Sequence, residues 1–152
     1  MNAETASPSS ISGSDSEAAS LLKRIKALEP QIRAAADSIE TERRLPDELV
    51  DALRATGLFR ASWPHAMGGL ELDPISQIKV LAELSRIDGS VGWLGTFASI
   101  GGLIGATIEP EAAKELFPNP DVVSAGQYAP RGYAERVDGG YRVNGQWSFG
   151  SG

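Results

Sequence analysis

The sequence contains no cysteine and only one histidine, His65, among its 152 residues. The absence of cysteine excludes disulfide bonds, thiolate nucleophiles and cysteine-ligated metal sites, and it is compatible with a reducing compartment. A single histidine leaves no histidine cluster for zinc or iron. We therefore predict no metal site, and we expect a cytoplasmic protein in which His65 is a surface or structural histidine.

Basic residues are scarce relative to acidic ones, with 14 Lys and Arg against 20 Asp and Glu and a net charge of −6. Such a chain lacks the positive surplus that attracts phosphates, so we expect no nucleic-acid partner and no anionic-membrane partner. A secretory signal is not evident either, because residues 1–16 lack a basic start and an apolar centre. Residues 1–16 are rich in serine, which predicts a disordered tail.

Charge is absent from the twenty residues between Gly89 and Ile108, a length that could cross a bilayer. Six of these residues are glycine and four are serine or threonine. Small residues of this kind favour a helix packed on all sides by protein over a membrane span. We predict a buried helix, on which Trp93 either belongs to the core or lines a substrate or flavin cavity.

Helical periodicity begins at Glu17 and continues to about Arg44. The apolar residues recur at spacings of four and three: Leu21, Ile25, Leu28, Ile32, Ala35 and Ile39. Pro30 lies inside this stripe and removes a backbone donor, which predicts one helix with a kink near residue 26. The charged end, residues 40–44, is interpreted as a solvated face.

Besides the uncharged helix over residues 89–108, three more helices are indicated before residue 119. Pro46 at a first helical position and Gly57 at a C-terminal cap bracket one of them. Asp73 predicts the N-cap of the next, with an apolar stripe through Ile75, Ile78, Leu81, Leu84 and Ile87. Asp88 would cap the uncharged helix, and a short helix is predicted from Pro110 to about residue 117. Residues 59–69 should form a loop folded onto the helices.

Strand patterns replace helical spacing after residue 121. We predict strands over Val122–Gly126, Tyr133–Val137 and Tyr141–Phe149, with residues 138–140 as a hairpin turn. Alternation places Tyr141, Val143, Trp147 and Phe149 on one face of the last strand. The sequence thus predicts an α+β chain with a tail (1–16), an all-helical domain (17–119) and the start of an antiparallel β domain (120–152). Because no partner strands follow, we expect the β domain to be incomplete.

Several strings of residues carry a family resemblance: Leu45–Leu53 leading to Gly57–Phe59, then Pro64 with Gly68–Gly69, then Glu83–Ser90, and finally Gly139–Gly145. Their order and spacing resemble the acyl-CoA dehydrogenase superfamily of flavoproteins. The resemblance implies a helical domain, a central β barrel and a C-terminal four-helix bundle, with flavin between barrel and bundle. This chain would hold the first domain and the opening strands of the second, and the parent would be a homotetramer.

The ending Trp147–Gly152 looks more like the flavin-dependent two-component monooxygenase branch. That branch hydroxylates aromatic or polyketide-like substrates with reduced flavin, FAD or FMN, from a separate reductase. By this resemblance Phe149 would flank the flavin and Ser151 would hydrogen-bond near its N5 atom, with Trp147 nearby. Gln127 and Tyr128 would be weaker contacts to the pyrimidine edge.

Other interpretations remain open at this point. Trp147 and Phe149 could be ordinary core residues of a sheet. Residues 89–108 lack the histidine that the monooxygenase branch often carries on this helix. The parent could instead be an acyl-CoA dehydrogenase, whose glutamate base lies in the C-terminal half, so no residue here is assigned as catalytic. A catalytically silent helical interaction domain is the third possibility.

Overall fold

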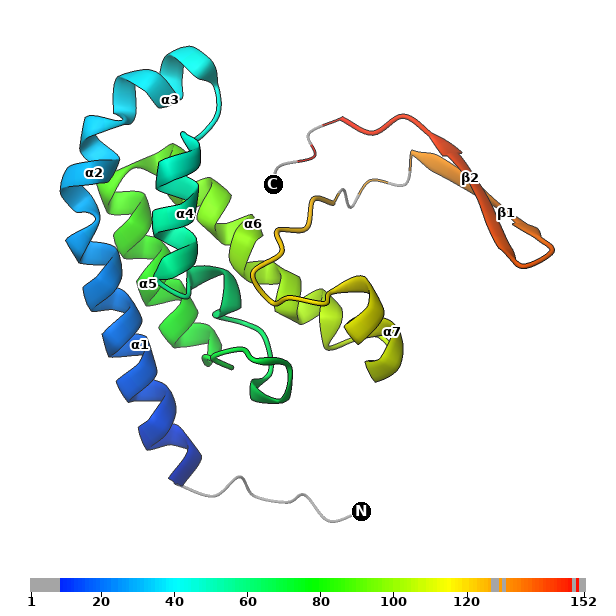
Figure 1. The fold of residues 1–152 in the computed structure, drawn as a ribbon, viewed down its shortest axis with the longest axis horizontal. Helices are drawn as coiled ribbons and strands as arrows, with labels where there is room; N and C mark the ends of the chain where they lie inside the picture. Colours follow the sequence, from blue (N-terminus) through cyan, green and yellow to red (C-terminus); the bar gives the residue numbers. More distant parts are fainter. Residues whose placement is uncertain (1–8, 127–128, 130, 149, 151–152) are drawn as a thin grey trace.

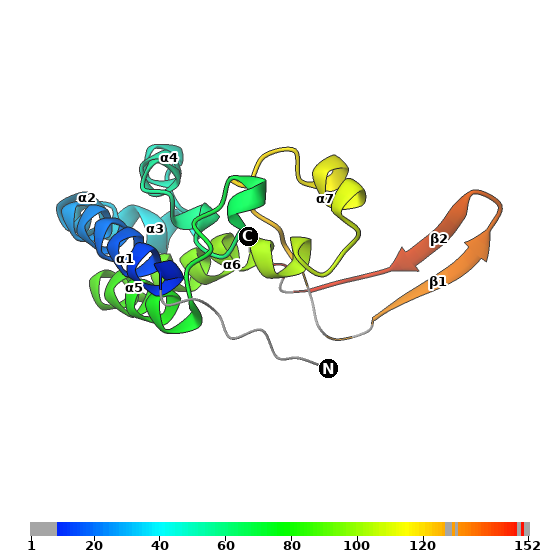
Figure 2. The same ribbon diagram turned by 90° about the horizontal axis from the view of Figure 1, so that it is seen from below.

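The computed structural model describes residues 9–126, 129, 131–148 and 150, with the backbone alone for residues 9–14. The helices are α1 (Ser9–Ala27), α2 (Glu29–Ala34), α3 (Ala36–Glu42), α4 (Asp47–Ala55), α5 (Pro74–Ile87), α6 (Gly89–Gly105) and α7 (Pro110–Leu116). Two 3₁₀ turns, η1 (Leu58–Arg60) and η2 (His65–Met67), join α4 to α5. Strands β1 (Gly132–Val137) and β2 (Gly140–Gly145) form a hairpin that extends away from the helices in both views (Figures 1 and 2). The predicted α+β class with an incomplete β part is confirmed.

The long helix predicted after residue 17 is divided into α1, α2 and α3. The first division is at Leu28, just before the proline, and the second is at Ala35. The N–H of Ala35 is shared between the carbonyls of Gln31 and Ile32, so the path stays nearly helical. The apolar stripe therefore keeps its phase. Its buried members are Leu21, Ile25, Ile32 and Ile39.

Helix α1 begins at Ser9, eight residues before the predicted start at Glu17. Residues 9–16 thus continue the helix, in contrast to the disordered tail predicted for residues 1–16. Once a helix is nucleated, each added residue gains a backbone hydrogen bond, so polar residues can extend an end that packing holds in place. The limits of the predicted domains stay predictions.

Helices α5 and α6 pack on each other, and α5 also packs on α1. The Asp73 carboxylate accepts the backbone N–H of Ile75, and the Asp88 carboxylate accepts that of Val91, each at 2.9 Å. Both predicted N-caps are therefore confirmed. The predicted apolar stripe of α5 is partly wrong, because Ile75 and Ile78 are 61% and 62% exposed. The buried face, set by contact with both neighbours, instead contains Ser76, Val80, Leu84 and Ile87.

The glycines of α6 allow close packing of the loop that follows α4. A Cβ on Gly102 would lie 2.4 Å from the backbone nitrogen of Trp63, and one on Gly105 would lie 2.4 Å from its ring. Trp63 itself is fully buried, and its ring meets Phe117 edge to face at 5.1 Å. The loop is thus folded onto the helices, as predicted. No helix in the described part of the chain has the length and hydropathy that crossing a membrane requires.

An ion-pair network joins α2 to α5 at the surface. Arg86 Nη2 lies 2.8 Å from Glu29 Oε2 and 2.9 Å from Glu83 Oε1, and Arg33 also pairs with Glu29. Hydrogen bonds from Arg86, the largest cause, lower the pKa of both carboxyl groups below the ordinary value. The same bonds raise the pKa of Arg86.

The hairpin pairs Gly132 with Gly145 at its open end and Val137 with Gly140 at its turn. Gly139 has a φ of +78°, which agrees with the predicted tight turn. Two strand predictions are wrong: residues 122–126 form no strand, and β2 ends at Gly145 well before residue 149. A strand needs a hydrogen-bonded neighbour, and within the described residues only the β1–β2 pairing exists.

Candidate functional site

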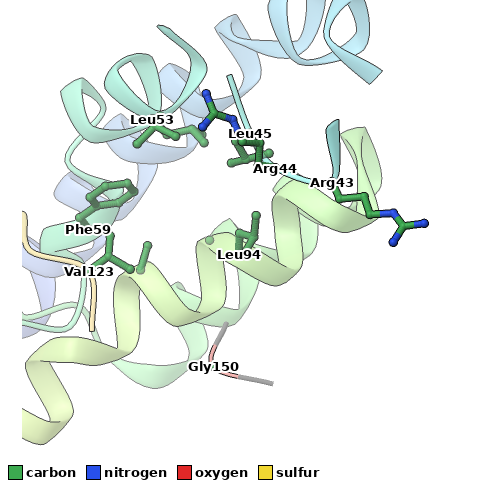
Figure 3. A pocket seen from close by; sticks show the side chains of 11 residues that line it. Arg43, Arg44, Leu45, Leu53, Phe59, Leu94, Val123 and Gly150 are labelled. Atoms are coloured by element: carbon green, nitrogen blue, oxygen red, sulfur yellow. The ribbon is translucent and has the colours of Figure 1, made fainter. Parts of the chain in front are cut away.

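A hollow of about 500 Å³ lies between α4, the turn after it and α6 (Figure 3). Apart from two arginines and two glycines, its lining is apolar: Leu45, Val50, Leu53, Phe59, Leu94, Ala98 and Val123. Leu53, Phe59 and Ala98 belong to the core, and Leu94 lines the hollow from α6. A hollow of this size with apolar walls lies in the range of small-molecule binding sites.

A second hollow of about 490 Å³ adjoins the first and shares Arg43, Arg44 and Leu94 with it. Trp93 stands on its wall, 60% exposed, with its ring edge to face against Phe97 at 5.1 Å. The alternative that Trp93 is a core residue is therefore wrong, because a core indole would be buried. Its contact with substrate stays a prediction.

Arg43 and Arg44, in the link between α3 and α4, line both hollows, and Figure 3 shows their side chains extending in different directions. Both are exposed, as the interpretation of a solvated face requires, but that interpretation missed their position at a cavity. Arg43 has a left-handed backbone with φ of 54°. Two adjacent arginines before a proline carry no signal that could have placed them there, because the hollow is built from residues on α6 more than 40 positions away.

The predicted cofactor residues fall mostly outside the described part of the chain. Gln127, Tyr128, Phe149 and Ser151 lie there, and their roles stay predictions. Gly150, between the last two, lines the first hollow.

Trp147 is the one predicted cofactor residue that the structure describes. It is 49% exposed, and its indole covers the glycines at the open end of the hairpin. A Cβ on Gly132 would lie 2.2 Å from this ring, and a Cβ on Gly145 would lie 2.6 Å from it. The indole is thus neither a core residue nor free, and its role in binding cofactor stays a prediction.

The described residues include the kinds of group that a flavin site needs. An isoalloxazine ring needs flat apolar walls and a few fixed polar groups. The first hollow supplies apolar walls, whereas the half-exposed indole of Trp147 packs on the hairpin and is not among the residues that line the hollow. Two buried polar atoms near Gly101, Trp63 Nε1 and Ser124 Oγ, have no hydrogen-bond partner within the described residues, but neither residue lines the two hollows.

No group of three metal-ligating side chains occurs among the residues that the structure describes. His65 is held by its own loop: its Nδ1 lies 3.0 Å from the carbonyl of Gly69, and its backbone N–H donates to Glu71. The exposed position and these contacts agree with the prediction of a surface or structural histidine.

The family described as "Acyl-CoA dehydrogenase, N-terminal domain" matches residues 19–118. The chain belongs to this family.

Its relatives in sequence are oxygenases. The chain is 35% identical over 132 residues to the flavin-dependent monooxygenase oxygenase subunit HsaA of Rhodococcus jostii, covering 86% of this chain and 35% of that protein. It is 35% identical over 121 residues to indole-3-acetate monooxygenase of Pseudomonas putida, covering 79% of this chain and 31% of that protein. The chain thus spans about a third of the length of these relatives.

Solved structures agree. XiaF from Streptomyces, solved in complex with FADH2 and glycerol, superposes with a TM-score of 0.85 at 30% identity, over 91% of this chain and 35% of that one. The HsaA monooxygenase from Mycobacterium tuberculosis superposes with a TM-score of 0.80 at 37% identity, over 86% of this chain and 35% of that one. The predicted resemblance to the monooxygenase branch is confirmed.

Proposed function

We propose that this chain is the N-terminal part of a reduced-flavin monooxygenase that hydroxylates an aromatic substrate. The observation that carries the proposal is the apolar hollow between α4 and α6, with Gly150 on its wall. Its relatives are flavin-dependent monooxygenases, and a structural neighbour was solved with FADH2. We further propose a separate flavin reductase as partner, a homotetrameric parent and a cytoplasmic location.

The residues of this chain would bind and shield an aromatic ring. Leu53, Phe59 and Leu94 offer it apolar contact, and Trp93 continues the wall into the second hollow. When bound, reduced flavin supplies the electrons that activate molecular oxygen. Apolar walls exclude water from the reacting centre, which protects reactive groups from side reactions.

The flavin contacts in this proposal are those predicted from the sequence. Phe149 would flank the ring, Ser151 would donate near its N5 atom, and Trp147 would lie nearby. The position of Gly150 on the wall of the hollow supports the first two, because Gly150 lies between Phe149 and Ser151 in the sequence. Gln127 and Tyr128 would contact the pyrimidine edge.

Oxygen incorporation tests the proposal. The whole protein that carries this chain is supplied with chemically reduced FAD or FMN, a panel of phenols and ¹⁸O₂. One labelled oxygen atom in a hydroxylated product is expected. Bleaching of bound FAD by an acyl-CoA thioester, without oxygen incorporation, would instead identify an acyl-CoA dehydrogenase.

The chain alone gives a second test, directed at the silent-domain alternative. Reduced FAD or FMN is titrated into it under anaerobic conditions, and binding is followed by calorimetry. Saturable binding that Ser151→Ala or Phe149→Ala weakens supports the predicted flavin contacts. An absence of binding would show that this part by itself is no flavoprotein.

A further inference from the structure

The segment that follows α7, residues 118–124, contains no helix or strand, and we refer to it as the strap. One of its residues, Val123, packs on the hydrophobic core and lines the first hollow (Figure 3). Within the described part of the chain, the one backbone hydrogen bond of the strap is internal, from the N–H of Val122 to the carbonyl of Asn119 at 3.2 Å. Side chains therefore set the position of this wall of the hollow.

Buried polar atoms without a hydrogen-bond partner gather where the strap meets the loop after α4. Among the described residues five side-chain atoms are of this kind, and four of them lie at this seam. Arg60 and Trp63 of the loop each contribute an N–H donor, and Asp121 and Ser124 of the strap each contribute an oxygen acceptor. Buried polar groups are normally paired, so two unpaired donors opposite two unpaired acceptors require an explanation.

Each donor lies close to an acceptor. Arg60 Nε is 3.1 Å from Asp121 Oδ1, the distance of an ion pair, although the two atoms are not aligned as a hydrogen bond. Trp63 Nε1 and Ser124 Oγ both border Gly101, where an added Cβ would lie 3.6 Å from the nitrogen and 3.5 Å from the oxygen. The two donors are three residues apart, as are the two acceptors, so a single small displacement of the strap can align both pairs.

Resting on the proposed function, we propose that the strap closes on an aromatic ligand in the first hollow and that closing forms a hydrogen bond in both pairs. Val123 lies between the two acceptors in the sequence and lines the hollow, so contact with the ligand and alignment of the pairs occur together. A ligand shifts an equilibrium between two conformations only as far as it binds one of them better. Apolar contact with Val123 in the closed position supplies that difference.

Removal of the Ser124 hydroxyl distinguishes this closure from a fixed structural role. In the ligand-free chain the hydroxyl oxygen is buried and unpaired, so Ser124→Ala should leave the free energy of unfolding in urea unchanged or raised. In the closed complex the variant lacks one hydrogen bond, so the Kd of the ligand should rise about fivefold. The matched control Ser16→Ala, at an exposed position on α1, should change neither quantity.

NMR titration of the labelled chain with 1-naphthol, a neutral aromatic probe, measures the Kd and also observes the Trp63 indole directly. The three indole N–H signals are assigned with Trp93→Phe and Trp147→Phe variants. At saturation the Trp63 N–H signal should move downfield and exchange more slowly with solvent, because this group gains an acceptor. Ser124→Ala should abolish both changes.

The second pair has its own variant. Asp121→Asn should raise the Kd of 1-naphthol by a similar factor, about fivefold, because the bond from Arg60 in the closed position loses its charge. Glu111→Gln, which removes the charge from an exposed pair with Lys114 on α7, should leave the Kd unchanged.

Three results would overturn the proposal: a Trp63 signal that saturating 1-naphthol leaves in place, wild-type affinity in Ser124→Ala, or no binding of 1-naphthol to the wild-type chain. A clear loss of stability in ligand-free Ser124→Ala would also overturn it, because the hydroxyl would then be bonded before the ligand arrives. Failure of the proposed function is distinguishable. Labelled oxygen in a product of the whole protein, with the Trp63 signal unmoved in this chain, would keep the function and sink the closure, and the shift without oxygen incorporation would do the reverse.

Discussion

Two adjacent glycines on α6, Gly101 and Gly102, should respond to alanine in opposite directions. A Cβ on Gly102 would lie 2.4 Å from the Trp63 nitrogen and 2.5 Å from the Ser62 carbonyl carbon, both backbone atoms. A Cβ on Gly101 would lie 3.5 Å from Ser124 Oγ and from the Trp63 ring, which is ordinary van der Waals contact. The helix and the change in helix propensity are the same, so only the steric environment differs.

The magnitudes follow from two opposing effects. Alanine in place of glycine stabilises a helix interior by about 0.5–1 kcal/mol. Overpacking costs about 1–3 kcal/mol, and the upper part of that range applies where the obstacle is backbone. Gly102→Ala should therefore lower the free energy of unfolding by about 1–2 kcal/mol, whereas Gly101→Ala should raise it by about 0.5–1 kcal/mol.

Urea denaturation followed by circular dichroism measures both free energies of unfolding, and thermal melts check them. At roughly 2–4 °C per kcal/mol for a chain of this size, the two variants should differ in Tm by several degrees. Equal stability of the two variants would refute the close approach of α6 to the Ser62–Trp63 backbone. So would a Gly102→Ala protein more stable than the wild type.

Three further predictions concern a cap, an ion-pair network and a strained turn. Asp88→Ala should lower the free energy of unfolding by about 1 kcal/mol in urea denaturation, because α6 loses its N-cap; an unchanged midpoint would count against the cap. Glu29→Gln and Glu83→Gln should each destabilise near pH 7, because the lowered pKa values mean that these carboxylates stabilise the fold above their ordinary pKa of 4.5. The difference from wild type should shrink as pH falls through the lowered pKa values, with Arg86 left without a charged partner, and a difference that persists near pH 2 would contradict this. Arg43→Gly should leave the free energy of unfolding unchanged or raise it by up to about 1 kcal/mol, since relief of the left-handed backbone offsets the entropy of glycine; a clear loss of stability would show that this arginine serves the fold.

Local signals in the sequence were enough to predict most of the helical part. Asp73 and Asp88 are caps because a carboxylate before a helix accepts its free N–H groups, a relation confined to neighbouring residues. The exposed Ile75 and Ile78 show the limit of such signals. Periodicity in the sequence identifies an apolar stripe on a helix, but the neighbouring helices decide which face of the helix is buried.

The candidate site was less predictable than the fold. Trp93 could be proposed for a cavity because it is a large aromatic on a helix of small residues, and the structure places it on a cavity wall. Arg43 and Arg44 could not be proposed for a cavity from the sequence, because their location depends on how the α3–α4 link meets α6. The absence of a strand over residues 122–126 has a similar cause, since a strand is defined by its partner as much as by its own residues.

The most direct test of the central claim is the fate of molecular oxygen in the whole protein that carries this chain. With reduced flavin, ¹⁸O₂ and a small aromatic acid or phenol, the proposed function predicts a product with one additional oxygen atom that carries the label. Label found only in water or hydrogen peroxide, together with reduction of bound flavin by an acyl-CoA thioester, would contradict it.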